Sequence, residues 1–155
     1  MKIRSVKANN RKKVFELRTH SKELVFPYVK ADPPPGPADR IVELHVDREL
    51  GREAFVYVLE SGQEGTIHIE QVLDYNQDPA YLRELLLYRL TLEARNRIEE
   101  CGLSRREIVR RLGTSATQLY RLLDQTNTRK SIDQVLELLH ILDCEVDLVV
   151  RTRSA

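Results

Sequence analysis

The feature that most constrains the fold is a change of hydrophobic period near residue 78. Before it, short segments alternate apolar and polar side chains at every second residue, which is typical of strands with one buried face. After it, apolar residues recur every three or four positions, which is typical of amphipathic helices. This order favours an α+β fold with two domains, residues 1–77 and 78–155.

Residues 1–75 contain short runs of β-branched and aromatic residues between turn signals. In "KVFELRT", for example, Phe15 and Leu17 alternate with Val14, Glu16 and Arg18. The proline-rich stretch "ADPPPGPAD" is incompatible with a helix or a central strand, so it predicts a stiff surface loop. We therefore expect a small antiparallel β domain. Its strands would be "KIRSVKAN", "KVFELRT", "ELVFPYV", "RIVELHVD", "AFVYVLES" and "TIHIEQVL".

The second part begins with a long helix. Asp78 is a candidate N-cap, Pro79 suits the first helical position, and Gly102 marks the end, so the helix would have roughly 23 residues. Its first half is apolar on more than one side, which suggests burial between domains or between subunits. Three S-x-x-E/Q capping boxes then mark further helix starts, at Ser104, Ser115 and Ser131. The ending "CEVDLVVRT" alternates like a final strand.

Charge is distributed unevenly along the chain, although the net charge is only +1. Residues 1–30 carry nine Lys or Arg against two Asp or Glu, and residues 103–130 carry seven against two. Such local fields attract polyanions whatever the net charge is. The composition is therefore compatible with a nucleic-acid partner.

The sequence contains no signal for several classes of function. The chain has no run of eighteen apolar residues and no signal-peptide core, so we expect a cytoplasmic protein with no membrane contact. Cys101 and Cys144 lack a C-x-x-C partner and are expected to be reduced core thiols. The four histidines lack metal-ligand spacing, and no catalytic motif occurs. We expect no metal, no cofactor and no enzymatic activity.

Residues 104–124 have the pattern of a helix, a three-residue corner and a second helix. The apolar residues of the two helices would face each other, and Gly113 suits a left-handed corner. The second helix would present its first turns outward, in a form that fits the major groove of DNA. The apolar positions are Ile108, Val109, Leu112, Leu119, Leu122 and Leu123, and the outward ones are Ala116, Thr117, Gln118, Tyr120 and Arg121.

The stretch "LSRREIVRRLGTSATQLYRLLD", followed by "SIDQVLELLHILDCEVDLVV", resembles the lambda-repressor-like helix-turn-helix family, also called the Cro/C1 type or XRE family. The resemblance covers about residues 88–143, and the tail is similar to a subset common among bacterial antitoxins. It implies that the β domain is followed by a long helix and an all-α helix-turn-helix domain with a C-terminal strand. It also implies a bacterial transcriptional regulator that binds double-stranded DNA.

By position, the resemblance implies three groups of contacts. Arg105 and Arg106 would meet phosphates, and Gln118 and Arg121 would read adenine and guanine. The loop after the second helix would make further contacts with the DNA phosphate backbone, although "DQTNTRK" lacks the family's frequent Glu-Asn-Gly turn. Arg110 and Arg111 are expected to be solvated. The full predicted DNA-binding set is Arg105, Arg106, Ser115, Ala116, Thr117, Gln118, Tyr120, Arg121, Thr126, Asn127, Arg129 and Lys130.

Other interpretations stay open at this level. A lone final strand needs a partner, so it would pair with its copy in a homodimer or join the sheet of its own chain; we favour the homodimer. The chain could instead be an antitoxin that binds both operator DNA and a toxin protein, or a helix-turn-helix module that binds protein and no DNA. The basic turn at residues 11–13 is either solvated or a second DNA contact. The β domain could bind a protein or a small molecule.

Overall fold

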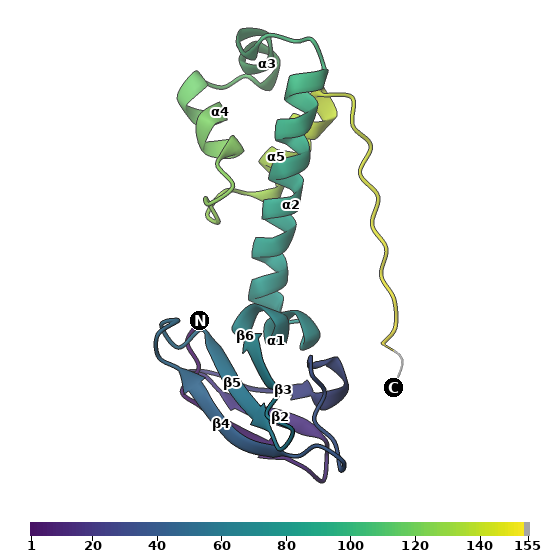
Figure 1. The fold of residues 1–155 in the computed structure, drawn as a ribbon. Helices are drawn as coiled ribbons and strands as arrows, with labels where there is room; N and C mark the ends of the chain where they lie inside the picture. The colour runs from purple at the N-terminus through teal and green to yellow at the C-terminus, as the bar shows by residue number, and fades with distance from the viewer. Residues whose placement is uncertain (154–155) are drawn as a thin grey trace. The chain divides into compact units, whose positions relative to one another are not determined.

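The structure, a computed structural model, describes residues 1–153 and forms two compact units, Met1–Leu82 and Arg83–Ala155. Figure 1 labels most of the helices and strands of both units. The first unit contains β1 (Ser5–Asn9), β2 (Val14–Arg18), β3 (Glu23–Pro27), the short 3-10 helix η1 (Tyr28–Lys30), β4 (Ile41–Asp47), β5 (Ala54–Leu59), β6 (Glu64–His68) and α1 (Ile69–Tyr75). Helix α2 (Pro79–Glu100) begins in the first unit and continues into the second, which also contains α3 (Arg105–Leu112), α4 (Ala116–Leu123) and α5 (Ile132–Ile141).

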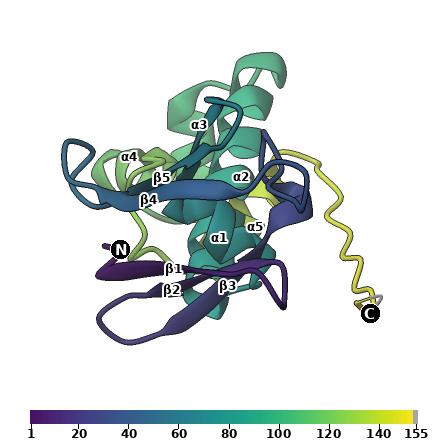
Figure 2. The ribbon, with the colours of Figure 1, turned by 60° about the horizontal axis from the view of Figure 1, so that its bottom comes forward.

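The strands of the first unit form two antiparallel sheets, in the orders β1-β2-β3 and β4-β5-β6. Figure 2 shows the two sheets as two layers. Each hairpin register keeps its apolar side chains on one face: Phe15 pairs with Phe26 in the first sheet, and Phe55 pairs with Ile67 in the second. Because side chains alternate between the faces of a strand, this register gives both sheets an apolar inner face.

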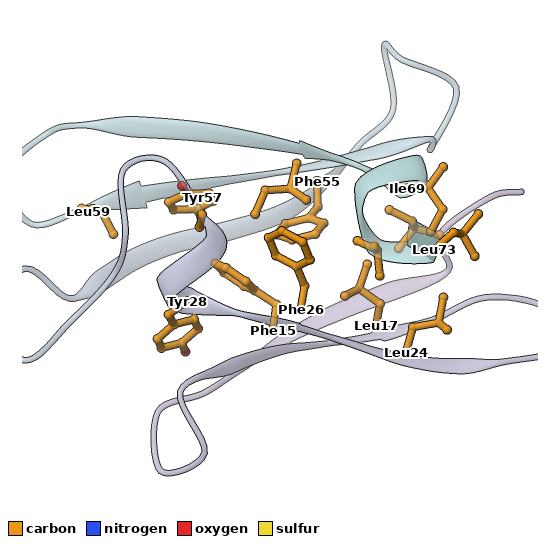
Figure 3. Packing of buried hydrophobic residues seen from close by; sticks show 14 residues of the cluster. Phe15, Leu17, Leu24, Phe26, Tyr28, Phe55, Tyr57, Leu59, Ile69 and Leu73 are labelled. Carbon is orange, nitrogen blue, oxygen red and sulfur yellow. The ribbon is translucent and has the colours of Figure 1, made fainter. Parts of the chain in front are cut away.

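The core of the first unit lies between these two faces (Figure 3). Phe15 is central, since its ring lies 4.9 Å from the ring of Phe55 and 5.2 Å from that of Tyr57, in tilted arrangements that favour aromatic contact. Ile69 and Leu73 of α1 close one end of the core. The core is therefore shared by both sheets and by a helix.

The fold class predicted from the sequence was wrong. We expected one antiparallel β domain, then a long helix and an all-α domain with a closing strand. Instead, the strands form two three-stranded sheets, and a helix belongs to the same unit as they do. The proline-rich stretch at 32–37 explains the split, because its prolines cannot continue a ladder from β3 into β4.

Helix α1 was missed because its sequence, "TIHIEQVL", begins as a strand. The strand ends at His68, whose Nδ1 accepts a hydrogen bond from the Glu70 N–H at 3.4 Å. The Gln71 side chain accepts in turn from the His68 N–H at 2.9 Å. This reciprocal capping box starts a helix in the middle of an apolar run. Histidine is not among the residues preferred at the N-cap position, so the sequence contained no signal that a helix starts after His68.

The predicted final strand is also absent from the described residues. Residues 145–153 have no strand assignment. Leu148 is 78% exposed and Val150 is 84% exposed, and Val146 is half exposed. The alternation of apolar side chains is present, but it faces no partner strand among residues 1–153.

Helices α2 to α5 begin at the caps that were predicted from the sequence. The Asp78 carboxylate accepts from the Tyr81 N–H at 3.1 Å, so the predicted cap of α2 is confirmed. Ser104, Ser115 and Ser131 each accept from the N–H three residues later, at 3.1 to 3.2 Å. The core of the second unit is formed by apolar residues of α2 to α5, among them Leu87, Ala94, Ile108, Leu119, Val135 and Leu138.

Gly65 provides a test of the first unit. A Cβ at this position would lie 2.2 Å from Cζ of Tyr57, which is fully buried and is held by its hydroxyl, a donor to the Pro33 carbonyl at 2.7 Å. Gly65→Ala is expected to lower the free energy of unfolding by about 1–3 kcal/mol through overpacking. Gly36→Ala is the control, because a Cβ there meets nothing within 4 Å. Urea unfolding of both variants checks this, and an equal effect would contradict the packing described.

Candidate nucleic-acid interface

The corner between α3 and α4 is set by Gly113, which has φ 67° and ψ 33°. Its N–H donates to the Arg110 carbonyl, and the Thr114 N–H donates to the Val109 carbonyl, both at 3.2 Å. These two bonds form a Schellman motif, which satisfies the last carbonyls of α3. Because the left-handed conformation is strained for residues with a Cβ, the glycine allows the chain to turn sharply into α4. Figure 1 shows the two helices on either side of this corner.

Helix α4 has one buried face and one exposed face. Leu119 is only 2% exposed, and Leu122 and Leu123 are also buried in the core of the second unit. Residues between and before them point outward. Each of the five outward positions predicted from the sequence is exposed: Ala116, Thr117, Gln118, Tyr120 and Arg121. Ser115 is exposed as well, but its hydroxyl oxygen accepts from the Gln118 N–H and therefore caps the helix.

One pocket brings together residues that are distant in sequence. Gln118 and Arg121 of α4 and Asn127 and Arg129 of the following loop line a shallow cavity of about 310 Å³. Lys130, and Gln134 of α5, line the same cavity. The structure thus places five predicted contact residues from two segments around one concave surface, Lys130 among them.

Arg105 and Tyr120 meet on another surface of the same helix pair. The Arg105 guanidinium lies 5.3 Å from the centroid of the Tyr120 ring, a cation–π distance. The tyrosine remains 63% exposed, so this pair lies at the surface. Both residues line a cavity of about 210 Å³ together with Arg95. The neighbouring Arg106 is exposed and has no ion pair among residues 1–153.

Lys130 does not face outward as the resemblance implied. It is only 6% exposed, and its Nζ donates to the carbonyls of Leu122 at 2.9 Å and Asp124 at 2.8 Å. Burial lowers the pKa of its ammonium, and the nearby Asp124 carboxylate partly opposes this effect. The lysine ties the C-terminal end of α4 to the loop. It is therefore a structural residue rather than a phosphate contact.

The rest of this loop is held by hydrogen bonds at the end of α4. The Asp124 carboxylate accepts from the Thr126 N–H at 2.9 Å and from the Thr126 hydroxyl at 2.7 Å, and these bonds hold the pKa of Asp124 below its usual value. The Asn127 amide donates to the Arg121 carbonyl at 3.2 Å, and its Oδ1 accepts from the Arg129 N–H at 3.1 Å. Thr126 and Asn127 thus organise the turn, while the Arg129 side chain stays exposed.

Two arginines of α3 have an internal partner. Glu107 accepts from Arg110 Nε at 2.9 Å and from Arg111 Nε at 3.0 Å. These bonds lower the pKa of the Glu107 carboxyl to about 2. The sequence predicted that Arg110 and Arg111 are solvated, and both are exposed but paired. Their charges are partly cancelled at the surface.

Three residues of this region were not predicted from the sequence. Arg83 donates to the carbonyls of Thr128 at 2.8 Å and Lys130 at 3.5 Å, which connects the loop to α2. Arg95 lines the same cavity as Arg105, and Gln134 lines the same cavity as Arg121. Their signal in the sequence was a polar residue on a helix surface, which does not distinguish them from ordinary solvated positions.

Comparisons with known proteins found no match among family models, curated proteins or solved structures. Among the described residues no helix is long and apolar enough to cross a membrane. No group of three metal-ligating side chains occurs within residues 1–153.

The role of Lys130 generates a prediction. Lys130→Met is expected to lower the free energy of unfolding of the second unit by about 1–3 kcal/mol, because two buried carbonyls lose their donor. Arg129→Met removes the same charge from an exposed neighbour and should change stability by less than about 0.5 kcal/mol. Thermal unfolding followed by circular dichroism measures both. Equal stabilities for the two variants would show that the lysine does not hold the loop.

Proposed function

We propose that this chain is a sequence-specific DNA-binding transcriptional regulator that inserts α4 into the major groove. The observation that carries the proposal is the division of α4 into a buried leucine face and an exposed face of Thr117, Gln118 and Arg121. A helix that is anchored on one side by a neighbouring helix and bare on the other has the form that the major groove admits. The resemblance to the lambda-repressor-like family points to the same function.

Base reading is assigned to Gln118 and Arg121. They lie one turn apart on α4 and line one concave surface. Glutamine offers the donor and acceptor pair that matches adenine, and arginine offers two parallel donors that match guanine. Ala116 carries no hydrogen-bonding group and would contact a thymine methyl. These side chains supply direct readout.

Phosphate anchoring is assigned to Arg105, Arg106 and Arg129. All three are exposed, and none forms an ion pair within the described chain. The contact with Tyr120 restricts the motion of the Arg105 guanidinium, which reduces the entropy lost when it binds a phosphate. Lys130 is not included, because it is buried and its ammonium already donates to two backbone carbonyls.

A homodimer is the second part of the proposal. The tail carries Val146, Leu148 and Val150 at alternate positions, all exposed. Pairing with the same segment of a second copy would satisfy the backbone groups of both tails and bury these side chains. Such a two-fold dimer would bind a pseudo-palindromic site.

An antitoxin is the alternative that a specific observation favours. Helix α2 exposes Leu86, Tyr88 and Leu92, in addition to the apolar tail. Tyr88 and Leu92 are four residues apart and share one face of the helix, and exposed apolar side chains that lie close together often mark a protein-binding surface. In this alternative the same DNA-binding part is kept, and the tail or α2 neutralises a toxin protein.

The reading role of Arg121 is tested by substitution. Arg121→Ala is expected to weaken binding to the preferred site roughly 5- to 150-fold, the cost of about 1–3 kcal/mol for one bidentate base contact, with a smaller loss on random DNA. Arg105→Ala should weaken binding to the preferred site and to random DNA alike, and it should reduce the slope of log affinity against log salt by about 1. Fluorescence anisotropy at several salt concentrations measures these effects. Arg110→Ala is the matched control, because Arg110 is already paired with Glu107.

Equal losses on both DNA sequences for Arg121→Ala would refute its reading role. An unchanged affinity for both Arg121→Ala and Arg105→Ala would refute the proposed DNA-binding surface as a whole.

Dimerisation through the tail is tested by substitutions on its two faces. Leu148→Asp with Val150→Asp is expected to convert a dimer into a monomer, since charges would enter the paired apolar face. Val149→Asp places a single negative charge on the other face of an extended segment and should leave the dimer intact. Sedimentation velocity distinguishes the states. A wild-type chain that remains monomeric would contradict the homodimer and would favour the antitoxin alternative.

A further inference from the structure

The first unit contains a pocket that the proposed DNA-binding residues do not include. Its volume is about 310 Å³, and it lies between the turn that joins β1 to β2, η1 and the proline-rich loop before β4. The basic turn and the proline-rich stretch are both conspicuous in the sequence, and neither has a role in the proposed function. The pocket is where they meet. It is lined by Asn10, Lys13, Tyr28, Pro35, Pro37 and Arg40, among others.

One wall of this pocket is rigid. The proline-rich loop is held at Pro33, whose carbonyl accepts from the Tyr57 hydroxyl at 2.7 Å. Its far end is closed by paired backbone hydrogen bonds between Gly36 and Asp39, at 3.1 and 3.2 Å. The Asp39 carboxylate also accepts from the N–H of Ser61 at 2.9 Å and from its hydroxyl at 2.6 Å. A site held in this way needs little ordering when a ligand binds.

The floor of the pocket is apolar. Tyr28 is only 4% exposed, and its ring meets the ring of Phe15 edge-on at 4.9 Å, at one end of the core in Figure 3. Pro35 and Pro37 of the loop and Ile41 of β4 complete the apolar lining. Such a floor suits a ligand with an apolar body.

The polar groups at the rim are donors. The side chains of Lys13 and Arg40 form no ion pair within residues 1–153, and no carboxylate lines the pocket. The Oδ1 of Asn10 accepts from the Tyr28 hydroxyl at 2.8 Å, so its amide N–H groups remain to donate. Arg11 and Lys12 add positive charge in the same turn. An acceptor with negative charge is the complement of this rim.

We propose that this pocket binds a small organic anion, a carboxylate or phosphate carried on an apolar body. The two cations at the rim hold the anionic group, and Tyr28 with the two prolines contacts the body. Binding the phosphates of duplex DNA requires only an exposed basic turn. The apolar floor and the walls of this pocket would serve no purpose in such a contact, so they favour a small ligand. The inference does not depend on the proposed function of the second unit.

The experiment is a titration of the ¹⁵N-labelled full-length chain, followed by its amide NMR spectrum. The probes are benzoate and phenyl phosphate, with benzamide as the neutral isostere and inorganic phosphate as the anion without a body. We expect saturable shifts at residues 10–13 and 36–41 with at least one organic anion. Benzamide and inorganic phosphate should each bind roughly tenfold more weakly, because each lacks one of the two complementary parts.

The matched variants are K13Q/R40Q and K2Q/K7Q, which remove the same charge from the pocket and from outside it. The first pair should weaken binding of the organic anions roughly tenfold or more, and the second should have little effect. The proposal is overturned if neither organic anion gives saturable shifts, if either control probe binds equally well, or if both variant pairs lose binding equally. Shifts of residues 10–13 that arise with duplex DNA and with no organic anion would also overturn it.

Discussion

The burial of three leucines in α4 determines which side chains this helix can present. Leu119, Leu122 and Leu123 lie in the core with Ile108 of α3, and burying each of them contributes about 1.5–3 kcal/mol. The helix cannot rotate about its axis without exposing them. Since Gly113 fixes the direction in which the chain enters α4, both the orientation and the start of the helix are set by packing and backbone conformation. The outward position of Gln118 and Arg121 follows from these constraints.

Positive charge by itself does not identify the contact residues of this region. Lys130 and Arg83 use their donors to hold the loop after α4, and Arg110 and Arg111 share the carboxylate of Glu107. The exposed arginines that remain unpaired are on the outer surface of the helix pair and its loop. The basic block seen in the sequence thus contains residues with two different physical roles, which only the folded chain separates.

Local signals in the sequence predicted the helix boundaries of the second part. The serine caps of α3, α4 and α5 and the glycine corner depend on neighbours within a few residues, so a short stretch contains the necessary information. The burial of Lys130 could not be predicted in this way. Its partners are backbone carbonyls whose position depends on how α4 ends, and a lysine in a polar loop has the composition of a solvated turn.

In the first unit, too, local patterns predicted the elements but not the contacts between residues that are distant in sequence. The alternation of Phe15 and Leu17 correctly predicted a strand with one buried face, whereas the strand around Phe55 is buried on both faces. Which strands pair is decided by long-range contacts, so the division into two sheets was not visible. The tail is the opposite case, since residues 146–150 have the pattern of a strand but no partner within the described chain.

The central claim is that the exposed face of α4 reads a DNA sequence. In vitro selection from random duplex DNA with the full-length chain tests it most directly. The account predicts an enriched motif with two inverted half-sites, whose centres are separated by about one helical turn or a multiple of it. Recovery of a pool that remains random after repeated rounds, at a salt concentration where the chain still binds DNA, would contradict it.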